Sequence, residues 1–216
     1  MTVEELSAKL VELDKGVLYR GAHQVGTKEF CVLEFRRAVL HQSHSDTPDD
    51  FLDLRALNDA PWSSDTVRTT HLLPVLAALW DWPTWDIKIQ RDWATRVALE
   101  TVRQLVAELP GLPDDMRVRC RNATNLAEAR AAAVEATKEA EAAACAAEAT
   151  GWAMVLVAAS AAEWAVASME AASVAASVAG VAKAASLVAA QAAGAAAADT
   201  VLIQACQLLR NAIRHE

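Results

Sequence analysis

The stretch "LAEARAAAVEATKEAEAAACAAEAT", residues 126–150, decides the fold class, and alanine continues to dominate from there to Asp199. About half of the residues between Ala123 and Asp199 are alanine, and no proline interrupts them. Because alanine has the highest intrinsic helix propensity, this half of the chain is predicted to be helical. We therefore expect an all-α fold. A compact head of short helices is followed by long, tightly packed alanine-rich helices, in a bundle or a coiled-coil-like arrangement.

The character of the sequence changes at "ELPGLPDDM", residues 108–116. All six prolines lie at or before Pro113, and alanine dominates soon after it. The two prolines and the glycine are expected to end one helix, and Asp114 and Asp115 to begin the next. We therefore place an organisational boundary here. It separates a helical head with a polar and aromatic pocket (residues 1–112) from an alanine-rich packing or oligomerisation region (residues 113–216).

Capping and turn residues divide the head into short helices. Thr2 and Glu5 form a capping-box pattern at the first of them, and Thr47 followed by Pro48 is a typical start for the third. Pro74 is expected to kink the fourth. The segment "GVLYR" (16–20) is the one expected to be extended. The helices are predicted at about 2–13, 27–41, 47–58, from 63 onward, and 85–109.

Small and larger apolar residues recur every seven positions in the alanine-rich half, which is typical of the contact rows of a coiled coil. Gly151, Gly180 and Gly194 are the candidate breaks between its helices, because glycine destabilises a helix. A single helix that runs through all three glycines is the alternative. Charged residues are so rare between Thr150 and Leu209 that these helices must bury most of their surface. We therefore expect self-association through this half, as a dimer or a higher closed oligomer. The two rows are Val157, Trp164, Ala171, Val178, Ala185, Ala192 and Ser160, Ala167, Val174, Val181, Val188, Ala195, and the pattern resumes at Leu202, Cys206, Leu209 and Ile213.

The charge of the chain excludes several classes of partner. A net charge of -8 with 20 basic residues is no footprint for nucleic acid or an anionic membrane surface. The uncharged runs are shorter than the roughly 18–20 apolar residues of a membrane span, so neither nucleic acid nor a membrane is expected as a partner. The N-terminus lacks the apolar segment of a signal peptide, which predicts a cytoplasmic location. Scattered cysteines without a Cys-x-x-Cys pair indicate reduced thiols; they are Cys31, Cys120, Cys145 and Cys206.

The segment "EFCVLEFRRAVLHQSHSDTPDDF", residues 29–51, concentrates groups capable of chemistry. On a helix over 27–41, Cys31, Glu34 and His41 fall on one face, within a sector of about 80°. His44 and Asp46 follow on the next loop. The plainest interpretation is a buried cysteine, a Glu34–His41 pair at the edge of the core, and a loop that caps the next helix.

Three functional interpretations stay open for these groups. Cys31 could act as a thiolate nucleophile, with His23, His41 or His44 as its base. The groups are also ligand types for zinc or iron, but the seven-residue spacing from Glu34 to His41 departs from the i, i+4 spacing of metal-binding helices. No metal or other cofactor is therefore predicted. The same groups also suit hydrogen bonds to a small molecule. The possible metal ligands are Glu34, His41, His44 and Asp46.

Tryptophans cluster in "WDWPTW", residues 80–85, and at Trp93. Trp82, beside Pro83, is expected either to close the core between two helices or to form an aromatic wall for a ligand or a protein partner. Polar residues beside this cluster and near the turns complete the candidates. The candidate ligand-binding residues are His23, Asp46, Asn58, Asp59, Trp82, Arg91, Asp92 and Trp93.

Six short motifs, in order along most of the chain, resemble an uncharacterised family of bacterial and phage proteins with alanine-rich C-terminal repeats. They are "GAH" (21–23), "CVLE" (31–34), "SDTP" (45–48), "LND" (57–59), "LLPVL" (72–76) and "RDW" (91–93). The resemblance implies a cytoplasmic location in a bacterium or a phage-infected host, and it implies no activity. The sequence departs from the family pattern after "SDTP", where Phe51, Leu52 and Leu54 replace a usual second cysteine and proline. This departure speaks against a mechanism that needs two cysteines.

These observations favour a non-enzymatic, all-α binding or scaffold protein. It is expected to self-associate through its alanine-rich helices and to hold a small ligand, or contact a protein partner, through its N-terminal half. The alternative is a small hydrolase that uses Cys31 as nucleophile or a metal held by Glu34 and the nearby histidines.

Overall fold

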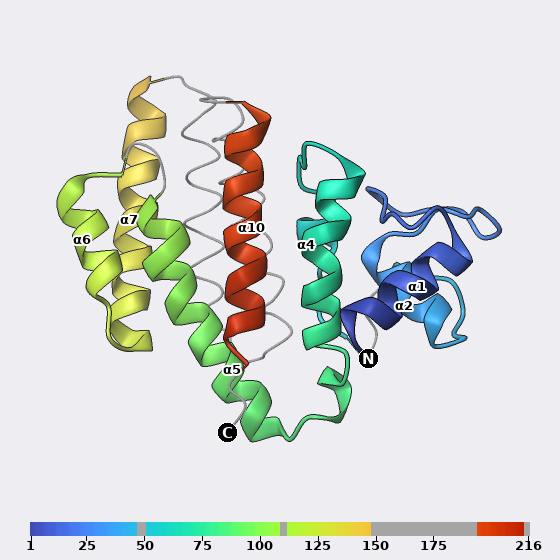
Figure 1. The fold of residues 1–216 in the computed structure, drawn as a ribbon. Coiled ribbons are helices and arrows are strands. Elements are labelled where there is room, and N and C mark those ends of the chain that lie inside the picture. Colours follow the sequence, from blue (N-terminus) through green and yellow to red (C-terminus); the bar gives the residue numbers. More distant parts are fainter. Residues whose placement is uncertain (47–50, 109–111, 148–193, 214–216) are drawn as a thin grey trace.

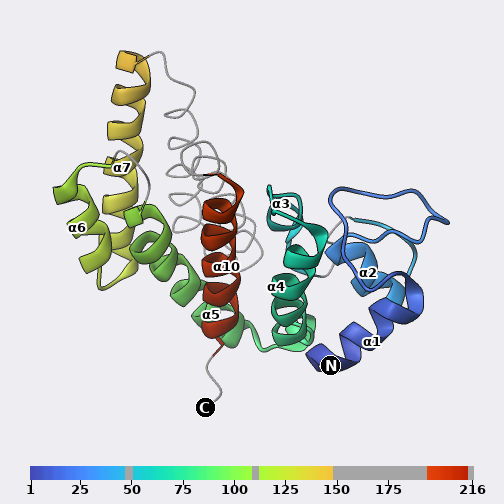
Figure 2. The same ribbon diagram turned by 45° about the horizontal axis from the view of Figure 1, so that its top comes forward.

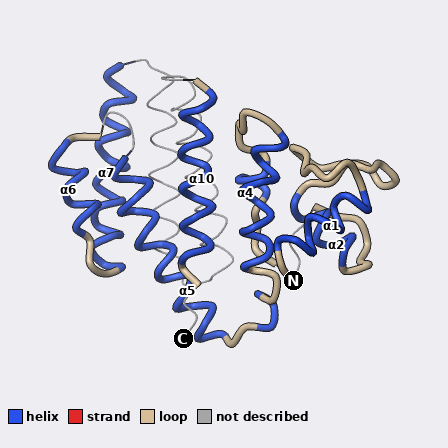
Figure 3. Tube along the Cα trace, in the orientation of Figure 1, coloured by secondary structure: helices blue, strands red, loops and turns tan. Residues whose placement is uncertain are grey.

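The computed structural model describes residues 1–46, 51–108, 112–147 and 194–213, and these form helices and loops without a strand (Figure 3). The predicted all-α class is thereby confirmed. Within these ranges no helix is both long and apolar enough to span a bilayer. The helices are α1 (Val3–Leu13), α2 (Val32–Val39), α3 (Arg55–Asn58), α4 (Asp65–Ala78), α5 (Ile87–Glu100), α6 (Asp114–Asn122), α7 (Leu126–Ala147) and α10 (Ala195–Asn211).

The last described helix returns to the first half of the chain. α10 packs against α4 and α5, with α1 and α2 at one end of the molecule and α6 and α7 at the other (Figures 1 and 2). Side chains of Trp93 and Arg96 on α5 donate to the carbonyl oxygens of Leu209 and Ala212, at 3.1 and 2.8 Å. Residues from both sides of the predicted 112/113 boundary therefore share one hydrophobic core. The boundary itself stays a prediction about sequence organisation.

The first helix forms as predicted, and the second differs. Both hydrogen bonds of the capping box between Thr2 and Glu5 are present at α1. α2 begins at Val32 rather than near residue 27, because Cys31 adopts an extended conformation and caps it. His41 has a φ of +54° and lies beyond the end of this helix. The predicted helix face shared by Cys31, Glu34 and His41 is therefore wrong.

The predicted helix at 47–58 is reduced to the single turn α3. Phe51, Leu52 and Leu54 are buried, although the segment that carries them is not helical. The Asp53 carboxylate accepts from the Arg55 amide (3.0 Å) and pairs with the Arg55 guanidinium (2.8 Å), which starts the turn at that point. Thr47 and Pro48 lie outside the described residues.

The helices that follow form close to where they are predicted. α4 begins after Ser64, whose hydroxyl accepts from the Val67 amide (3.2 Å), and it contains Pro74. α5 begins at Ile87 and continues into a π-helix, Thr101–Leu105, and a 3-10 turn, Val106–Glu108. The long helix predicted at 85–109 is thus present, but its hydrogen-bond pattern changes at residue 101.

Alanine packs the described part of the alanine-rich half. α7 buries Ala129, Ala132, Ala133 and Ala136, which form one helix face. α10 begins directly after Gly194 (φ +86°), so a helix starts at this glycine as predicted, and the segment before it lies outside the described residues. On α10 the contact row is buried at Leu202, Cys206 and Leu209, whereas Ala195 is exposed in the first turn, contrary to its predicted place on a contact row. The rows from Val157 to Ala192, with Gly151 and Gly180, lie outside the described residues.

Candidate functional site

Glu34 is the centre of a buried polar network at the start of α2. The Cys31 sulfur accepts from the Glu34 amide (3.5 Å), and the Glu34 carboxylate accepts from the Cys31 amide in return (2.8 Å). This is a capping box in which cysteine occupies the usual place of serine or threonine. Because Glu34 is 1% exposed, its carboxylate must find its partners within the protein.

Two histidines from the flanking loops supply those partners. The His23 amide donates to Oε1 of Glu34 (2.7 Å), and Nδ1 of the His23 ring lies 2.8 Å from Oε2. Nε2 of His44 lies 3.3 Å from Oε1 of Glu34 and 2.8 Å from the His23 carbonyl oxygen. The loop before α2 is thereby tied to the loop after it. We call His23, Cys31, Glu34 and His44 the Glu34 network.

Asn58 and Arg68 hold the backbone that carries His23. The Asn58 side chain donates to the Tyr19 carbonyl oxygen and to the Asp59 carboxylate, both at 2.9 Å. The same Asp59 carboxylate accepts from the Gly21 amide (2.8 Å). Arg68, which is 4% exposed on α4, donates from Nε to the Asn58 carbonyl oxygen (2.8 Å). The "LND" motif therefore fixes the loop that contains "GAH".

The surroundings of Cys31 do not activate its thiol. Burial raises the pKa of Cys31 to about 12, and the Glu34 carboxylate adds to the rise. A nucleophilic cysteine needs the opposite, a positive charge that lowers its pKa. Burial also opposes ionisation of Glu34. Hydrogen bonds from the Cys31 and His23 amides and from the His23 ring outweigh it, so the pKa of Glu34 lies below its usual value. The network thus holds a buried carboxylate in its charged form.

Of the four residues considered as metal ligands, Glu34 and His44 meet in the Glu34 network, and His41 and Asp46 do not join them. His41 is exposed, and its side chain makes no hydrogen bond to the described residues. Asp46 lies near Arg55, whose pKa is raised mainly by Asp53 and further by Asp46. In the described part of the chain, no group of three or more histidine, cysteine, aspartate or glutamate side chains is placed to hold a metal ion.

The tryptophan cluster lies in the core and does not form an open wall. Trp93 is fully buried and Trp82 is 5% exposed, with ring centroids 4.9 Å apart. Arg91 and Asp92 are exposed on α5, which Figures 1 and 2 show apart from α1 and α2. These four predicted candidates are therefore not brought together with the Glu34 network.

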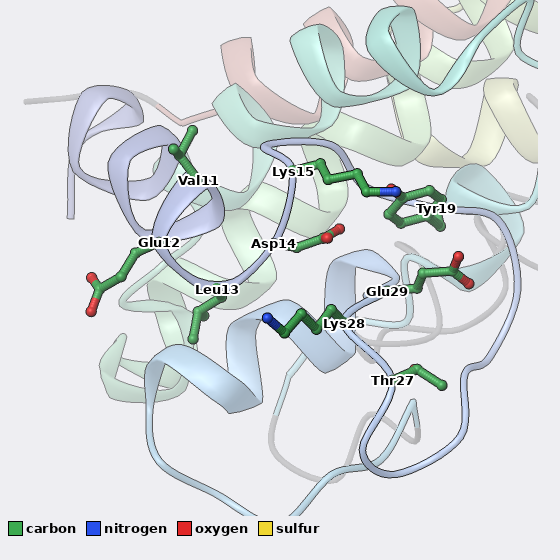
Figure 4. Close-up of a pocket in the computed structure, with 9 residues that line it drawn as sticks. All are labelled: Val11, Glu12, Leu13, Asp14, Lys15, Tyr19, Thr27, Lys28 and Glu29. Atoms are coloured by element: carbon green, nitrogen blue, oxygen red, sulfur yellow. The ribbon is translucent and has the colours of Figure 1, made fainter.

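A cleft of about 650 Å³ opens beside the Glu34 network, between the end of α1 and the loop that leads to α2. Its volume suits a small molecule. Figure 4 shows Asp14 pointing from the end of α1 toward the segment that carries Tyr19, whereas Glu12 points away. Tyr19 also borders the network, because its ring meets the His23 ring edge-on with centroids 6.0 Å apart. The cleft is lined by Val11, Glu12, Leu13, Asp14, Lys15, Tyr19, Thr27, Lys28 and Glu29.

Asp14, one of the residues that line the cleft, carries a carboxylate oxygen without a hydrogen-bond partner. This oxygen, Oδ2, is buried and has no partner among the described residues. Such atoms are rare, because leaving one without a hydrogen bond costs about 1–3 kcal/mol. Burial raises the pKa of the Tyr19 phenol, the negative charges of Asp14 and Glu29 raise it further, and a hydrogen bond with the Asp14 side chain also contributes. The Tyr19 phenol therefore lies beside the Asp14 carboxylate.

Sequence reasoning missed Asp14, Tyr19 and Arg68. Arg68 had a detectable signal, since it shares a helix face with Leu72 and Leu76, where a charged residue is unusual unless its charge is paired. Asp14 and Tyr19 had none, because they meet across a loop whose path depends on Asn58 and Asp59.

Comparison of the chain with protein-family models, with curated proteins and with solved structures found no match. The resemblance to the alanine-rich bacterial and phage family stays a prediction, and the function must be argued from the cleft and the network themselves.

Proposed function

We propose that the protein is a non-enzymatic helical binding protein that holds a small amine, cationic or zwitterionic, in the cleft at the end of α1. The observation that carries this proposal is the buried Oδ2 of Asp14, which has no partner among the described residues. An ammonium group at that position supplies a charge-assisted hydrogen bond, which is stronger than a neutral one.

The Asp14 carboxylate favours a ligand that carries a cationic group. Glu12 is paired with Lys9 (2.8 Å), so the lining charges that remain are the carboxylates of Asp14 and Glu29 and the ammonium groups of Lys15 and Lys28. An amine faces Asp14 in this arrangement, while a carboxylate on the same ligand finds a lysine. The charged lining residues are Glu12, Asp14, Glu29, Lys15 and Lys28.

The Glu34 network gives the cleft a fixed wall. Tyr19 contacts the His23 ring, and Glu29 lies 3.9 Å from Nε2 of His23. A wall whose side chains are held by buried hydrogen bonds loses little freedom when a ligand binds, which favours affinity. We assign the network this supporting role rather than a catalytic one, because the Cys31 thiol is buried with a raised pKa.

Isothermal titration calorimetry with three ligands of equal chain length tests the proposal. Butylamine is a cation, 4-aminobutyrate is a zwitterion, and butyrate is an anion. We expect both amines to bind and butyrate to bind at least about 10-fold more weakly, as the loss of a hydrogen bond between charged groups predicts. Equal affinity for butylamine and butyrate, or no binding of either amine, contradicts the proposal.

Two variants locate the binding. Asp14→Asn keeps the shape of the side chain and removes its charge, so it should weaken butylamine binding by about 10-fold. Glu12→Gln removes a carboxylate that points away from Asp14 in Figure 4 and should leave the affinity nearly unchanged. Melting curves of both variants should match the original protein, since Oδ2 of Asp14 accepts no hydrogen bond from the described residues.

We also propose self-association through the alanine-rich half. Its support is the sequence between 150 and 209, which carries four charged residues. Light scattering at tens of micromolar should report a dimer or a higher oligomer. A strictly monomeric chain contradicts this part of the proposal and leaves the amine-binding cleft untouched.

A further inference from the structure

A second pocket, of about 420 Å³, lies between α5 with its π-helical extension and α10. Its lining residues include two leucines, Leu99 and Leu208, two arginines, Arg96 and Arg103, and one glutamate, Glu100. The pocket therefore combines apolar groups with two cationic side chains and one carboxylate. Its charged groups differ from those of the cleft at α1, whose lining includes no arginine.

The two arginines are not equivalent. Nη1 of Arg103 donates to Oε1 of Glu100 (2.8 Å), and Nε2 of Gln104 donates to Oε2 of the same carboxylate (2.7 Å). Glu100 thus neutralises Arg103. Arg96 donates from Nε to the Ala212 carbonyl oxygen (2.8 Å), and its two terminal nitrogens have no partner in the described ranges. One guanidinium charge of the pocket is left uncompensated.

A π-helix that follows the end of α5 supplies part of this wall. Residues 101–105 form it, and Arg103 and Gln104 belong to it. The backbone irregularity is accommodated locally, because the Thr101 hydroxyl donates to the Val97 carbonyl oxygen (2.7 Å) and Gln204 of α10 donates to the Gln104 carbonyl oxygen (3.3 Å). Single π-helical turns inside α-helices occur frequently at functional sites.

We infer that this pocket binds a small organic carboxylate with a hydrocarbon body. The carboxylate accepts two hydrogen bonds from the terminal nitrogens of Arg96, a geometry for which the planar guanidinium is suited. The hydrocarbon body packs on Leu99 and Leu208, which supply the apolar contact that most ligand pockets use. The inference does not depend on the amine-binding proposal, because the two sites share no residue.

Benzoate and benzamide, titrated into the full-length protein and followed by calorimetry, test the inference. They share one shape, and benzoate alone is charged. We expect saturable binding of benzoate in the millimolar range or tighter, and at least about 10-fold weaker binding of benzamide, since one charged hydrogen-bond partner is lost. Equal binding of the two probes, or no saturable binding of benzoate, overturns the inference.

Two variants with opposite expected effects separate recognition from stability. Arg96→Gln should weaken benzoate binding by about 10-fold, and Glu100→Gln should strengthen it severalfold by removing the competing carboxylate. Arg130→Gln, an exposed arginine on α7, is the control and should leave the affinity unchanged. Arg96→Gln also removes a hydrogen bond to α10 and can lower the melting temperature. Glu100→Gln then distinguishes recognition of benzoate from a structural role of the pocket wall. A purely structural role predicts no tighter binding of benzoate by this variant. Unchanged or weaker binding therefore contradicts the inference.

Discussion

The loops around α2 and the helices α7 and α10 are held together in different ways. Around α2, buried polar groups connect segments that are distant in sequence, with Glu34, Asn58 and Arg68 each bonded to several backbone atoms. Along α7, by contrast, the buried face consists of alanine methyl groups. Hydrogen bonds to a buried charge concentrate stability in a few atoms, whereas methyl contacts contribute about 0.8 kcal/mol each and spread it over a long surface.

This difference determines how each region should respond to substitution. The α2 region should be sensitive to the loss of single polar groups and insensitive to changes at its rim. The alanine faces should tolerate little added volume, because close-packed helices have no room for it. The candidate ligand site lies in the α2 region, because the loops held by buried polar groups there border a cleft.

The largest effect is expected for Glu34→Ala. The substitution leaves the His23 and Cys31 amides without their acceptor and removes the partner of two histidine rings. We expect the free energy of unfolding to fall by about 3 kcal/mol or more, measured by urea denaturation. Glu29→Ala, at an exposed position beside the same histidine, should cost at most about 0.5 kcal/mol. Similar losses for both variants would remove the distinction between a buried network and its rim.

An intermediate effect is expected for Ala136→Leu on α7. Ala136 is fully buried, so the larger side chain must displace its neighbours, at a cost of about 1–3 kcal/mol. Ala131→Leu on the exposed face of the same helix should stay within about 0.5 kcal/mol. Thermal unfolding of the two variants compares them directly, and equal melting temperatures would show that α7 does not pack tightly. The same reasoning predicts a loss at Ala171 and Ala185, which lie outside the described residues.

The smallest effect concerns the dependence of stability on pH. The pKa of Glu34 lies below 4.5 in the folded protein, so the unfolded chain takes up this proton at higher pH than the folded one. The stabilisation is therefore complete above about pH 5 and is lost as the pH falls through the folded pKa.

Urea denaturation between pH 6 and pH 3 compares the buried carboxylate of Glu34 with the exposed carboxylate of Glu128. This range spans about one pH unit on each side of an ordinary glutamate pKa. Glu34→Gln should flatten the acid slope. Glu128→Gln should not, although hydrogen bonds from Thr124 lower the pKa of Glu128 as well, because that carboxylate is exposed and solvent screens it. An unchanged slope in Glu34→Gln means that its charge does not stabilise the fold.

The sequence predicts the helical class, α1 with its capping box, the helix start after Gly194 and three buried positions of α10, because these depend on local propensity and on periodicity. It does not predict where α2 begins. Cysteine is an unusual N-cap, and nothing local indicates that Cys31 and Glu34 form a capping box.

Part of the candidate site is also predictable from residue type and local sequence pattern. His23, Glu34, His44, Asn58 and Asp59 are recognisable as polar residues in an apolar context, and the structure brings them together. The cleft is not predictable, since Asp14 and the loop opposite it meet through tertiary contacts alone. His41 was misplaced because the helix that would have carried it ends at Val39.

The most direct test of the account is a titration of isotope-labelled protein with butylamine, followed by amide chemical shifts in two-dimensional NMR spectra. The amine-binding cleft predicts saturable shift changes at Asp14, Lys15 and Tyr19 and at the loop from Thr27 to Glu29. The amides of α7 and α10 should not move. A spectrum that does not change with butylamine, or one that changes mainly on α5 and α10, contradicts the account.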